Sequence, residues 1–263
     1  METEARDQSR GAVGESEGSI RKVPPPKWQI ADVIDVISET PETTTLRLAI
    51  PEPAEFTSGQ YYNIRIPVDG RPRPIQRAYS IASSPFPKFD VVEFGIKEME
   101  GGLVSPVLAK GTKVGDKLEV RGPYGAFTWT EEKGGPLLLI SAGSGVVPFM
   151  SMIRYSRAKN LSVPMHLLFS SKSSEYVIYS NELDELQSEL EWLTVTHTFT
   201  REPDHAAARY HRRIDKEMVA ELLKESSAEL AYICGPPEMV ELCEVELVDL
   251  GMKPENVYSE KYD

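Results

Sequence analysis

Cysteine is scarce in this sequence of 263 residues, which contains only Cys234 and Cys243. Two thiols cannot build a disulfide framework, nor can they supply the four ligands of an iron–sulfur cluster or a structural zinc site. The four histidines lack the spacing that would place two of them on one helix as metal ligands. The sequence therefore predicts no metal site, and any metal centre that this protein serves belongs to another molecule.

Long apolar runs and basic charge are also in short supply. No stretch approaches the ~18 apolar residues that a membrane-spanning helix needs, and the N-terminal segment lacks the apolar core of a signal peptide. We therefore expect a soluble, cytoplasmic protein. The 29 Lys and Arg residues stand against 41 Asp and Glu residues, which gives a net charge of −12. An acidic body argues against nucleic-acid binding, and the sequence says nothing about oligomeric state.

Three segments follow one another along the chain. Residues 1–27 are rich in Gly, Ser and charge and contain three consecutive prolines near their end, which predicts a disordered tail. Residues 28–133 contain short β-rich runs broken by Gly, Pro and Asp, which is typical of an antiparallel β-barrel. Residues 134–263 alternate apolar strands with helices, which predicts a doubly wound parallel α/β sheet. The expected fold is a two-domain protein with the barrel first.

The third segment begins with an apolar strand that leads into a glycine-rich loop and a helix over 148–159. Gly143, Ser144 and Gly145 would let the backbone turn sharply and approach a pyrophosphate at the helix start. Pro148 replaces the third glycine of the Rossmann pattern, and proline suits a first helical turn. A lone Gly-x-Gly is equally compatible with a purely structural turn. A later helix is expected over 180–192.

The ends of the next strands carry cations where an NAD site often carries an acid. Ser171 and Lys172 end one predicted strand, Thr200 and Arg201 end the next, and Arg213 follows. These residues favour the 2′-phosphate of NADPH over the hydroxyl of NADH, although NADH remains open. Each cation is equally compatible with a solvated surface charge.

Two short motifs in the first half have the chemistry of a flavin site. Arg77, Ala78, Tyr79 and Ser80 stand at the start of a predicted strand, and Gly101, Gly102, Leu103, Val104 and Ser105 follow another strand. An arginine can bind flavin phosphates, a tyrosine can stack on the ring, and a serine can bond to flavin N5. A glycine pair can bring backbone amides to a pyrophosphate.

The order of these motifs resembles the ferredoxin–NADP reductase superfamily over nearly all of residues 28–263. Residues 77–80 resemble its Arg-x-Tyr-Ser flavin motif, and residues 101–105 resemble its Gly-Gly-x-x-Ser loop. Residues 122–125 resemble the Gly-Pro-aromatic-Gly stretch that closes the barrel, and residues 142–148 resemble the pyridine-nucleotide loop. Cys234, Gly235, Pro236 and Pro237 resemble the Cys-Gly-Pro-Pro motif beside the nicotinamide.

The resemblance implies FAD in a domain over 28–133, a nicotinamide nucleotide in a domain over 134–263, and hydride transfer between them. Ser80 would support flavin N5, Cys234 and Ser144 would pack around the nicotinamide, and Glu260 could assist proton traffic. Tyr262 would cover the flavin as the family's C-terminal aromatic does. Here the tyrosine is penultimate, so Tyr258 or Tyr262 could instead anchor the tail.

The resemblance also implies a separate electron acceptor, because this chain lacks the cysteines of a fused ferredoxin domain. A ferredoxin is the expected partner. Ferredoxins are commonly acidic, so an acidic reductase needs a local basic patch to bind one. We expect that patch at Arg65, Arg71, Arg73 and Arg77, which are equally compatible with binding FAD phosphates or solvating a loop.

Three other functions remain to be weighed against the reductase. A flavin or ferric reductase would pass electrons to a small acceptor, and a flavin or nucleotide sensor would use the fold without turnover. A hydrolase with Ser144 as nucleophile would need glycine two positions earlier, where Ala142 stands. We therefore set the hydrolase aside and keep the other two as alternatives.

Overall fold

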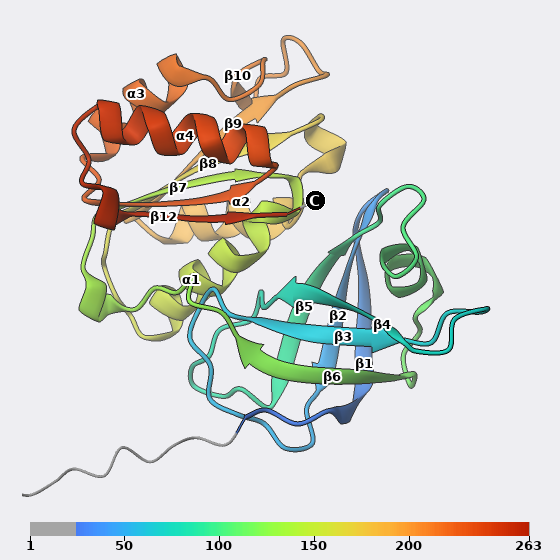
Figure 1. Ribbon diagram of the computed structural model, residues 1–263. Coiled ribbons are helices and arrows are strands. Elements are labelled where there is room, and N and C mark those ends of the chain that lie inside the picture. Colours follow the sequence, from blue (N-terminus) through green and yellow to red (C-terminus); the bar gives the residue numbers. More distant parts are fainter. Residues whose placement is uncertain (1–24, 263) are drawn as a thin grey trace, which may run out of the picture.

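The computed structural model describes residues 25–262, so residues 1–24 and 263 lie outside the description. Of the predicted N-terminal tail, only residues 25–27 are therefore described. The chain forms two sheets, one barrel-like and one covered by helices, that lie next to each other (Figure 1). Within the described residues, no helix has both the length and the apolar character that crossing a membrane requires.

The first sheet has six antiparallel strands in the order β4-β3-β6-β1-β2-β5. These strands are β1 (Gln29–Thr40), β2 (Thr43–Ala49), β3 (Tyr61–Ile66), β4 (Ile75–Ser80), β5 (Val91–Lys97) and β6 (Lys117–Tyr124). Just after β4, Ile81 forms an antiparallel bridge with Phe94 of β5, which joins the two edges of the sheet. The sheet therefore closes on itself as a barrel.

Apolar side chains fill the interior of this barrel, because alternate residues of its strands point inward. In β3, Tyr62, Ile64 and Ile66 are buried while the residues between them are only partly buried, as expected for a strand with one face toward a core. They pack with Phe94 and other apolar side chains of the facing strands in one cluster. A short π-helix, Val107–Gly111, adds the buried Leu108 to this cluster.

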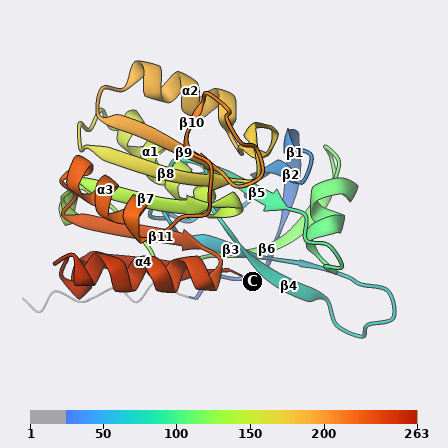
Figure 2. The same cartoon turned by 90° about the horizontal axis from the view of Figure 1, so that it is seen from above.

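The second sheet has six parallel strands in the order β10-β9-β8-β7-β11-β12. Its strands are β7 (Leu137–Ala142), β8 (Met165–Ser171), β9 (Leu193–Phe199), β10 (Ala208–Tyr210), β11 (Leu230–Gly235) and β12 (Val257–Lys261). Its helices are α1 (Val147–Ala158), α2 (Ser180–Glu189), α3 (Lys216–Ser226) and α4 (Pro237–Asp249). Figure 2 shows α1 and α2 on one face of the sheet, and α3 and α4 on the other.

Both faces of this sheet are apolar, which explains the uninterrupted run at 137–140. Leu137 and Leu139 belong to the cluster with α1 and α2, whereas Leu138 and Ile140 belong to the cluster with α3 and α4. A parallel strand covered on both faces needs apolar side chains in both directions. The predicted fold class, an antiparallel barrel followed by a doubly wound parallel sheet, is confirmed.

Three details differ from the sequence-based prediction. Residues 77–80 end β4 instead of starting a strand, because the pairing of β3 with β4 already begins at Ile75. The helix predicted over 180–192 ends at Glu189, because Leu190 turns to an extended conformation and packs against the core. The edge strands β10 and β12 were not predicted, since they are short and lack a continuous apolar pattern.

The outer face of β5 forms the centre of the contact between the two domains. Val92, Phe94 and Ile96 point into the barrel, so Glu93, Gly95 and Lys97 point the other way. A Cβ atom on Gly95 would lie 2.7 Å from the Tyr179 hydroxyl and 2.7 Å from Val147 Cγ2. Glycine at this position therefore lets the second domain pack directly on the barrel strand.

Candidate functional site

A cleft of about 520 Å³ opens between the two domains, and we call it the interdomain cleft. Its wall brings together residues from both sequence halves that the motifs singled out: Arg77, Ala78, Tyr79, Ser80, Gly102, Leu103, Val104, Ser105, Ser144, Cys234, Glu260 and Tyr262. Residues separated by more than half the chain thus share one cavity. Their chemical roles remain predictions.

The end of β4 forms the barrel side of this cleft. Arg77 and Ala78 are exposed, while Tyr79 and Ser80 are partly buried. The buried surroundings of the Tyr79 hydroxyl raise its pKa to about 12, so this tyrosine stays neutral. An exposed guanidinium beside a neutral aromatic ring can bind a phosphate and stack on a planar group at the same time.

A tight turn after β5 forms the neighbouring wall. Gly101 has a φ of +73°, and the Gly102 amide donates to the Met99 carbonyl at 2.9 Å. Ser105 Oγ accepts from the Met99 amide at 3.1 Å, and a Cβ atom on Gly102 would lie 2.9 Å from the Met99 oxygen. The turn therefore requires glycine and leaves its backbone close to the cleft, although Gly101 itself does not line it.

The glycine-rich loop after β7 is packed against β11. Gly143 has a φ of +51°, and a Cβ atom on Gly145 would lie only 2.0 Å from the Cys234 carbonyl oxygen. Residues 143–146 form a 3-10 turn that runs into α1, with Pro148 in the first helical turn. Gly145 and Pro148 shape this loop without lining the interdomain cleft, whereas Ser144 does line it.

Cys234 and Glu260 are partners in the register of the adjacent strands β11 and β12. Burial raises the pKa of the Cys234 thiol, and the nearby Glu260 charge raises it further, so Cys234 stays a thiol instead of a reactive thiolate. Burial also raises the pKa of Glu260. Glu260 Oε2 is buried with no hydrogen-bond partner among residues 25–262. The Glu260 carboxyl group can therefore hold a proton beside the cleft more tightly than an exposed carboxyl group does.

Tyr262 separates the interdomain cleft from a smaller one. Its hydroxyl donates to the Ala142 carbonyl, and its amide donates to the Gly235 carbonyl at 3.2 Å. Its ring lines both the interdomain cleft and a cavity of about 160 Å³ at the carboxyl ends of the parallel strands, the sheet-end cleft. Tyr262 is therefore anchored between the two cavities, and its stacking on a flavin remains a prediction.

The sheet-end cleft contains several of the residues predicted to bind a nucleotide. It is lined by Gly143, Ser171, Lys172, Thr200 and Pro236. Arg201 approaches through its backbone, whose amide donates to the Lys172 carbonyl at 2.8 Å. Within residues 25–262, neither Gly235 nor Arg213 lines either cleft, so the structure does not bring Arg213 to this group.

Lys97 and Glu42 belong to the site although sequence analysis did not find them. Lys97 lines both clefts, and its ammonium lies 3.5 Å from the position of a Cβ atom on Gly143. Burial is the main cause that lowers its pKa. Glu42 lines the sheet-end cleft and accepts a hydrogen bond from Lys172. The alternation along β5 indicated which way Lys97 points, but not what it meets.

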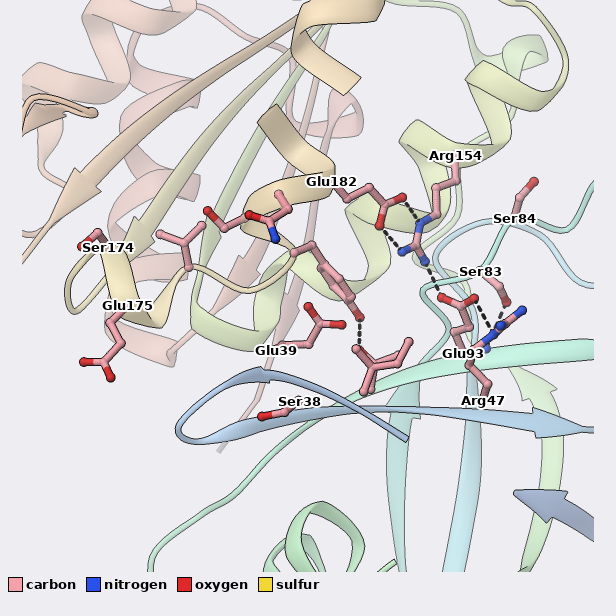
Figure 3. A pocket seen from close by; sticks show the side chains of 16 residues that line it. Ser38, Glu39, Arg47, Ser83, Ser84, Glu93, Arg154, Ser174, Glu175 and Glu182 are labelled. Atoms are coloured by element: carbon pink, nitrogen blue, oxygen red, sulfur yellow. Dashed lines mark hydrogen bonds and ion pairs between the residues drawn. The ribbon is translucent and has the colours of Figure 1, made fainter. Parts of the chain in front are cut away.

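A third cavity of about 760 Å³, the far cleft, lies at the other end of the outer face of β5. Figure 3 shows the Arg154 guanidinium there, between the carboxylates of Glu93 from the barrel and Glu182 from α2. Arg154 also donates to the Ala82 carbonyl at 3.0 Å. Among the described residues, those predicted for the site do not line this cleft. Arg154 therefore links the two domains at a place separate from the interdomain cleft.

The interdomain cleft fits the FAD that the motifs imply. The Gly102 turn is closed to side chains, so a diphosphate could approach its backbone closely, and Arg77 is an exposed cation that lines the same cleft. Tyr61, Tyr79 and Tyr262 supply aromatic surface for a planar ring. Glu260 lines the cleft, and its buried Oε2 has no hydrogen-bond partner among the described residues.

Comparison with known proteins agrees with this division of the chain. Residues 31–129 match the family model of an oxidoreductase FAD-binding domain, and residues 139–244 match that of an oxidoreductase NAD-binding domain. A ferredoxin–NADP reductase structure from Neisseria gonorrhoeae, with bound FAD and NADP, has a TM-score of 0.73 at 23% identity. It covers 89% of this chain and 98% of that chain, and at this identity it supports the fold.

Curated relatives extend the comparison to sequence. Ferredoxin–NADP reductase B of Sorangium cellulosum is 33% identical over 215 residues, which cover 79% of this chain and 86% of that protein. The reductase component of propane 2-monooxygenase from Gordonia sp. is 29% identical over 208 residues, which cover 77% of this chain. The chain spans only 58% of that relative's length. On its fold, its matched domains and its sequence, the chain belongs to the ferredoxin–NADP reductase superfamily.

Proposed function

We propose that this protein is a flavoprotein reductase that takes hydride from NADPH or NADH onto FAD and passes electrons to a separate acceptor. The observation that carries the proposal is the interdomain cleft, where Ser80 of the barrel lines the same cavity as Ser144, Cys234 and Glu260 of the second domain. The sheet-end cleft adjoins it through Lys97 and Tyr262. A flavin and a nicotinamide nucleotide bound in these two cavities would meet beside Lys97 and Tyr262, which line both.

The proposed domains are residues 28–133 for FAD and residues 134–263 for the nucleotide. The last barrel strand ends at Tyr124 and the first parallel strand begins at Leu137, which supports a boundary between them. The matches to an FAD-binding and an NAD-binding oxidoreductase domain support the same two ligands. The stretch at residues 122–125, expected to close the barrel, instead lies at the end of β6 inside the sheet, with the Tyr124 ring 5.9 Å from the Tyr61 ring, and the barrel closes through the Ile81–Phe94 bridge.

The proposed chemistry depends mainly on positioning. When bound, FAD supplies a centre that accepts two electrons together and releases them one at a time. The roles proposed for this chain are that Arg77 and the Gly102 turn bind the diphosphate and Tyr79 holds the ring. Ser80 and Glu260 hold a proton at the cleft, and the neutral Cys234 thiol packs against the nicotinamide. Holding both partners in contact supplies much of the rate.

We further propose that the acceptor is a ferredoxin-type iron–sulfur protein that binds the loop between β3 and β4. Arg71 and Arg73 of this loop are exposed, and Arg77 in β4 lines the interdomain cleft. Arg65 does not fit the predicted patch, because its guanidinium pairs with Glu119 at 2.6 Å and covers the Trp28 ring at 4.2 Å. The names of the matched reductases support an electron-transfer partner.

An acceptor panel tests this proposal. The holoprotein is mixed with NADPH and either an acidic ferredoxin, a ferric chelate or free flavin, in the wild type and in an Arg71→Glu/Arg73→Glu variant. We expect ferredoxin reduction by the variant to fall about tenfold or more at low salt, since the docking charge is reversed. Reduction of the ferric chelate should stay within about twofold, because small acceptors need no docking surface.

A matched control carries the same change in charge elsewhere. Lys224 at the end of α3 and Lys253 are both exposed, so Lys224→Glu/Lys253→Glu alters the net charge equally. Unchanged ferredoxin reduction in the Arg71 and Arg73 variant would refute the docking loop. Turnover with the chelate but not with any ferredoxin would instead favour the ferric or flavin reductase.

A further inference from the structure

Tyr179 has a backbone conformation that bulky residues rarely adopt. It directly precedes α2, and its φ of +60° and ψ of +29° lie in the left-handed region. Among the described residues, the other non-glycine residues with positive φ are Asn160, Asp204 and Ser227, and all three are exposed. Tyr179 is only 3% exposed. A buried aromatic residue in this conformation is strained, and such strain persists only where the surrounding contacts hold it.

Contacts with the barrel hold the Tyr179 ring in place. A Cβ atom on Gly95 of β5 would lie 2.7 Å from the Tyr179 hydroxyl, and Thr45 of β2 donates a hydrogen bond to this hydroxyl at 3.5 Å. The guanidinium carbon of Arg154 lies 5.1 Å from the centre of the ring. An aromatic side chain of the second domain is therefore anchored on the first domain.

The residues just before Tyr179 separate two of the clefts. Tyr176 and Ile178 line the sheet-end cleft. Val177 and Tyr179 line the far cleft. Successive side chains thus line opposite cavities, so the backbone of residues 176–179 runs between them. A wall of the sheet-end cleft is therefore the direct neighbour in the chain of the anchored ring.

The other end of this segment is attached to its own domain. The Ser174 amide donates to the carboxylate of Glu202, which follows β9, at 2.7 Å. The Lys172 ammonium lies 4.8 Å from the centre of the Tyr176 ring. The parallel sheet thus holds the start of the segment, and the barrel holds its end through Tyr179. The side chains between these two points keep their place only while both attachments remain.

We propose that Tyr179 is a positioning residue for the nicotinamide nucleotide. Its ring, anchored on Gly95, fixes the wall that Tyr176 and Ile178 contribute to the sheet-end cleft, and a wall fixed in advance costs less to order when NADPH or NADH binds. This inference rests on the proposed nucleotide function of that cleft. The described walls of the sheet-end and interdomain clefts do not include Tyr179, so it acts on affinity and not on the reacting atoms.

Titration of the holoprotein with NADP⁺ and with NAD⁺ measures affinity without turnover, because oxidised nucleotides cannot reduce the flavin. Tyr179→Asn removes the ring, and asparagine suits a left-handed backbone. We expect the dissociation constants of both nucleotides to rise about tenfold in this variant, since the wall must then be ordered on binding. At saturating NADPH, the limiting rate of flavin bleaching should stay within about twofold of the wild type. Tyr179→Phe keeps the ring, so its dissociation constants should stay within about twofold.

A change at Gly95 tests the anchor from the side of the barrel. A Cβ atom there would lie 2.7 Å from the Tyr179 hydroxyl and 2.7 Å from Val147 Cγ2, but 3.6 Å from the ring carbon that bears the hydroxyl. Gly95→Ala should therefore displace the ring and weaken nucleotide binding. Adding Tyr179→Phe removes one of the two clashes and should recover about threefold of the lost affinity, although Tyr179→Phe alone gives no such gain.

Leu186→Ala is the control for a general loss of stability. Leu186 of α2 is 1% exposed and belongs to the same core cluster as Tyr179, and the described walls of all three clefts leave it out. Its truncation leaves a cavity and should lower the melting temperature. The dissociation constants of both nucleotides should nevertheless stay within about twofold of the wild type. The flavin spectrum and the melting temperature of each variant establish that it is folded.

The outcomes distinguish this inference from the function on which it rests. Unchanged dissociation constants in Tyr179→Asn, or equal losses in Tyr179→Asn and Leu186→Ala, would overturn the role of Tyr179 and leave the proposed nucleotide site intact. If Tyr179→Asn does not fold, the Gly95→Ala pair decides, and a failure of Tyr179→Phe to recover affinity would overturn the role. A wild type that binds neither nucleotide, and whose flavin neither NADPH nor NADH bleaches, would contradict the proposed function and this inference together.

Discussion

At the scale of single residues, burial sets the chemistry of the candidate site. Cys234 is 3% exposed, and its raised pKa keeps it a thiol, so it can pack against a planar ring without reacting as a nucleophile. Glu260 Oε2 is buried without a partner among the described residues, which raises the pKa of that carboxyl group. Perturbed acids of this kind cluster at functional sites, where a proton must be held.

The raised pKa of Glu260 makes stability depend on pH in a definite direction. Folded Glu260 binds its proton more tightly than the unfolded chain does, so the stability from this group is complete below the ordinary value of 4.5. It is lost as pH rises through the raised pKa. The side chain of Glu260→Gln cannot ionise. The free energy of unfolding of this variant, relative to that of the wild type, should therefore rise by about 1 kcal/mol between pH 4.5 and pH 8.

Urea unfolding of the holoproteins at several pH values measures this difference. Glu255→Gln serves as the control, because Glu255 is exposed and close in sequence. Its unfolding free energy should follow the wild type at every pH. Parallel curves for Glu260→Gln and the wild type would mean that Glu260 is not shielded from water in the folded protein.

At the scale of secondary-structure elements, the outer face of β5 decides how the domains meet. Lys97 at one end lies beside Glu42 and Gly143, Gly95 in the middle touches Tyr179, and Glu93 at the other end pairs with Arg154. The apolar part of the contact adds Phe127, whose ring meets that of Tyr232 edge-on at 5.4 Å. These contacts fix the position of the glycine-rich loop relative to the end of β4.

Arg154 on α1 should carry much of the stability at the far end of this contact. Its side chain is 17% exposed, and its loss would leave Glu182 without its cation and Glu93 with Arg47, at 3.2 Å, as its remaining cation among the described residues. We expect Arg154→Met to lower the free energy of unfolding by about 2–4 kcal/mol, since breaking a buried pair strands its partners. Chemical denaturation measures the loss.

A control for Arg154 lies one turn further along the same helix. Arg157 pairs with Glu189, and both side chains are 50% exposed. Arg157→Met should cost less than about 1 kcal/mol, because exposed ion pairs contribute little. Equal losses for the two variants would show that the contact between the domains does not depend on the Arg154 network.

At the scale of the whole molecule, the sequence predicted the fold class and most of the interdomain cleft because its signals are local. The apolar run at 137–140 and the alternation of the barrel strands each reflect the faces of one element. The motifs at 77–80 and 101–105 lie in turns whose geometry needs those residues. Each of these features can be interpreted without knowing how the domains pack.

The site residues that could not be predicted from the sequence reach the site through contacts between the domains. Glu42 lies in a barrel turn and Lys97 in a barrel strand, and neither belongs to a binding motif. Both line the sheet-end cleft because the outer face of β5 packs against the second domain. Arg213 follows Arg201 along the chain but does not line the sheet-end cleft, so its role in nucleotide binding stays a prediction. Burial patterns give the direction of a side chain but not its distant neighbours.

One measurement tests the central claim, that a bound flavin connects a nicotinamide nucleotide to a separate acceptor. The purified protein, saturated with FAD, is mixed anaerobically with NADPH and separately with NADH while the visible flavin absorbance is followed. The account predicts that the yellow protein is bleached by nicotinamide nucleotide and regains its colour when an electron acceptor is added. A bound flavin that keeps its colour with both nucleotides would contradict the account and favour a sensor built on the same fold.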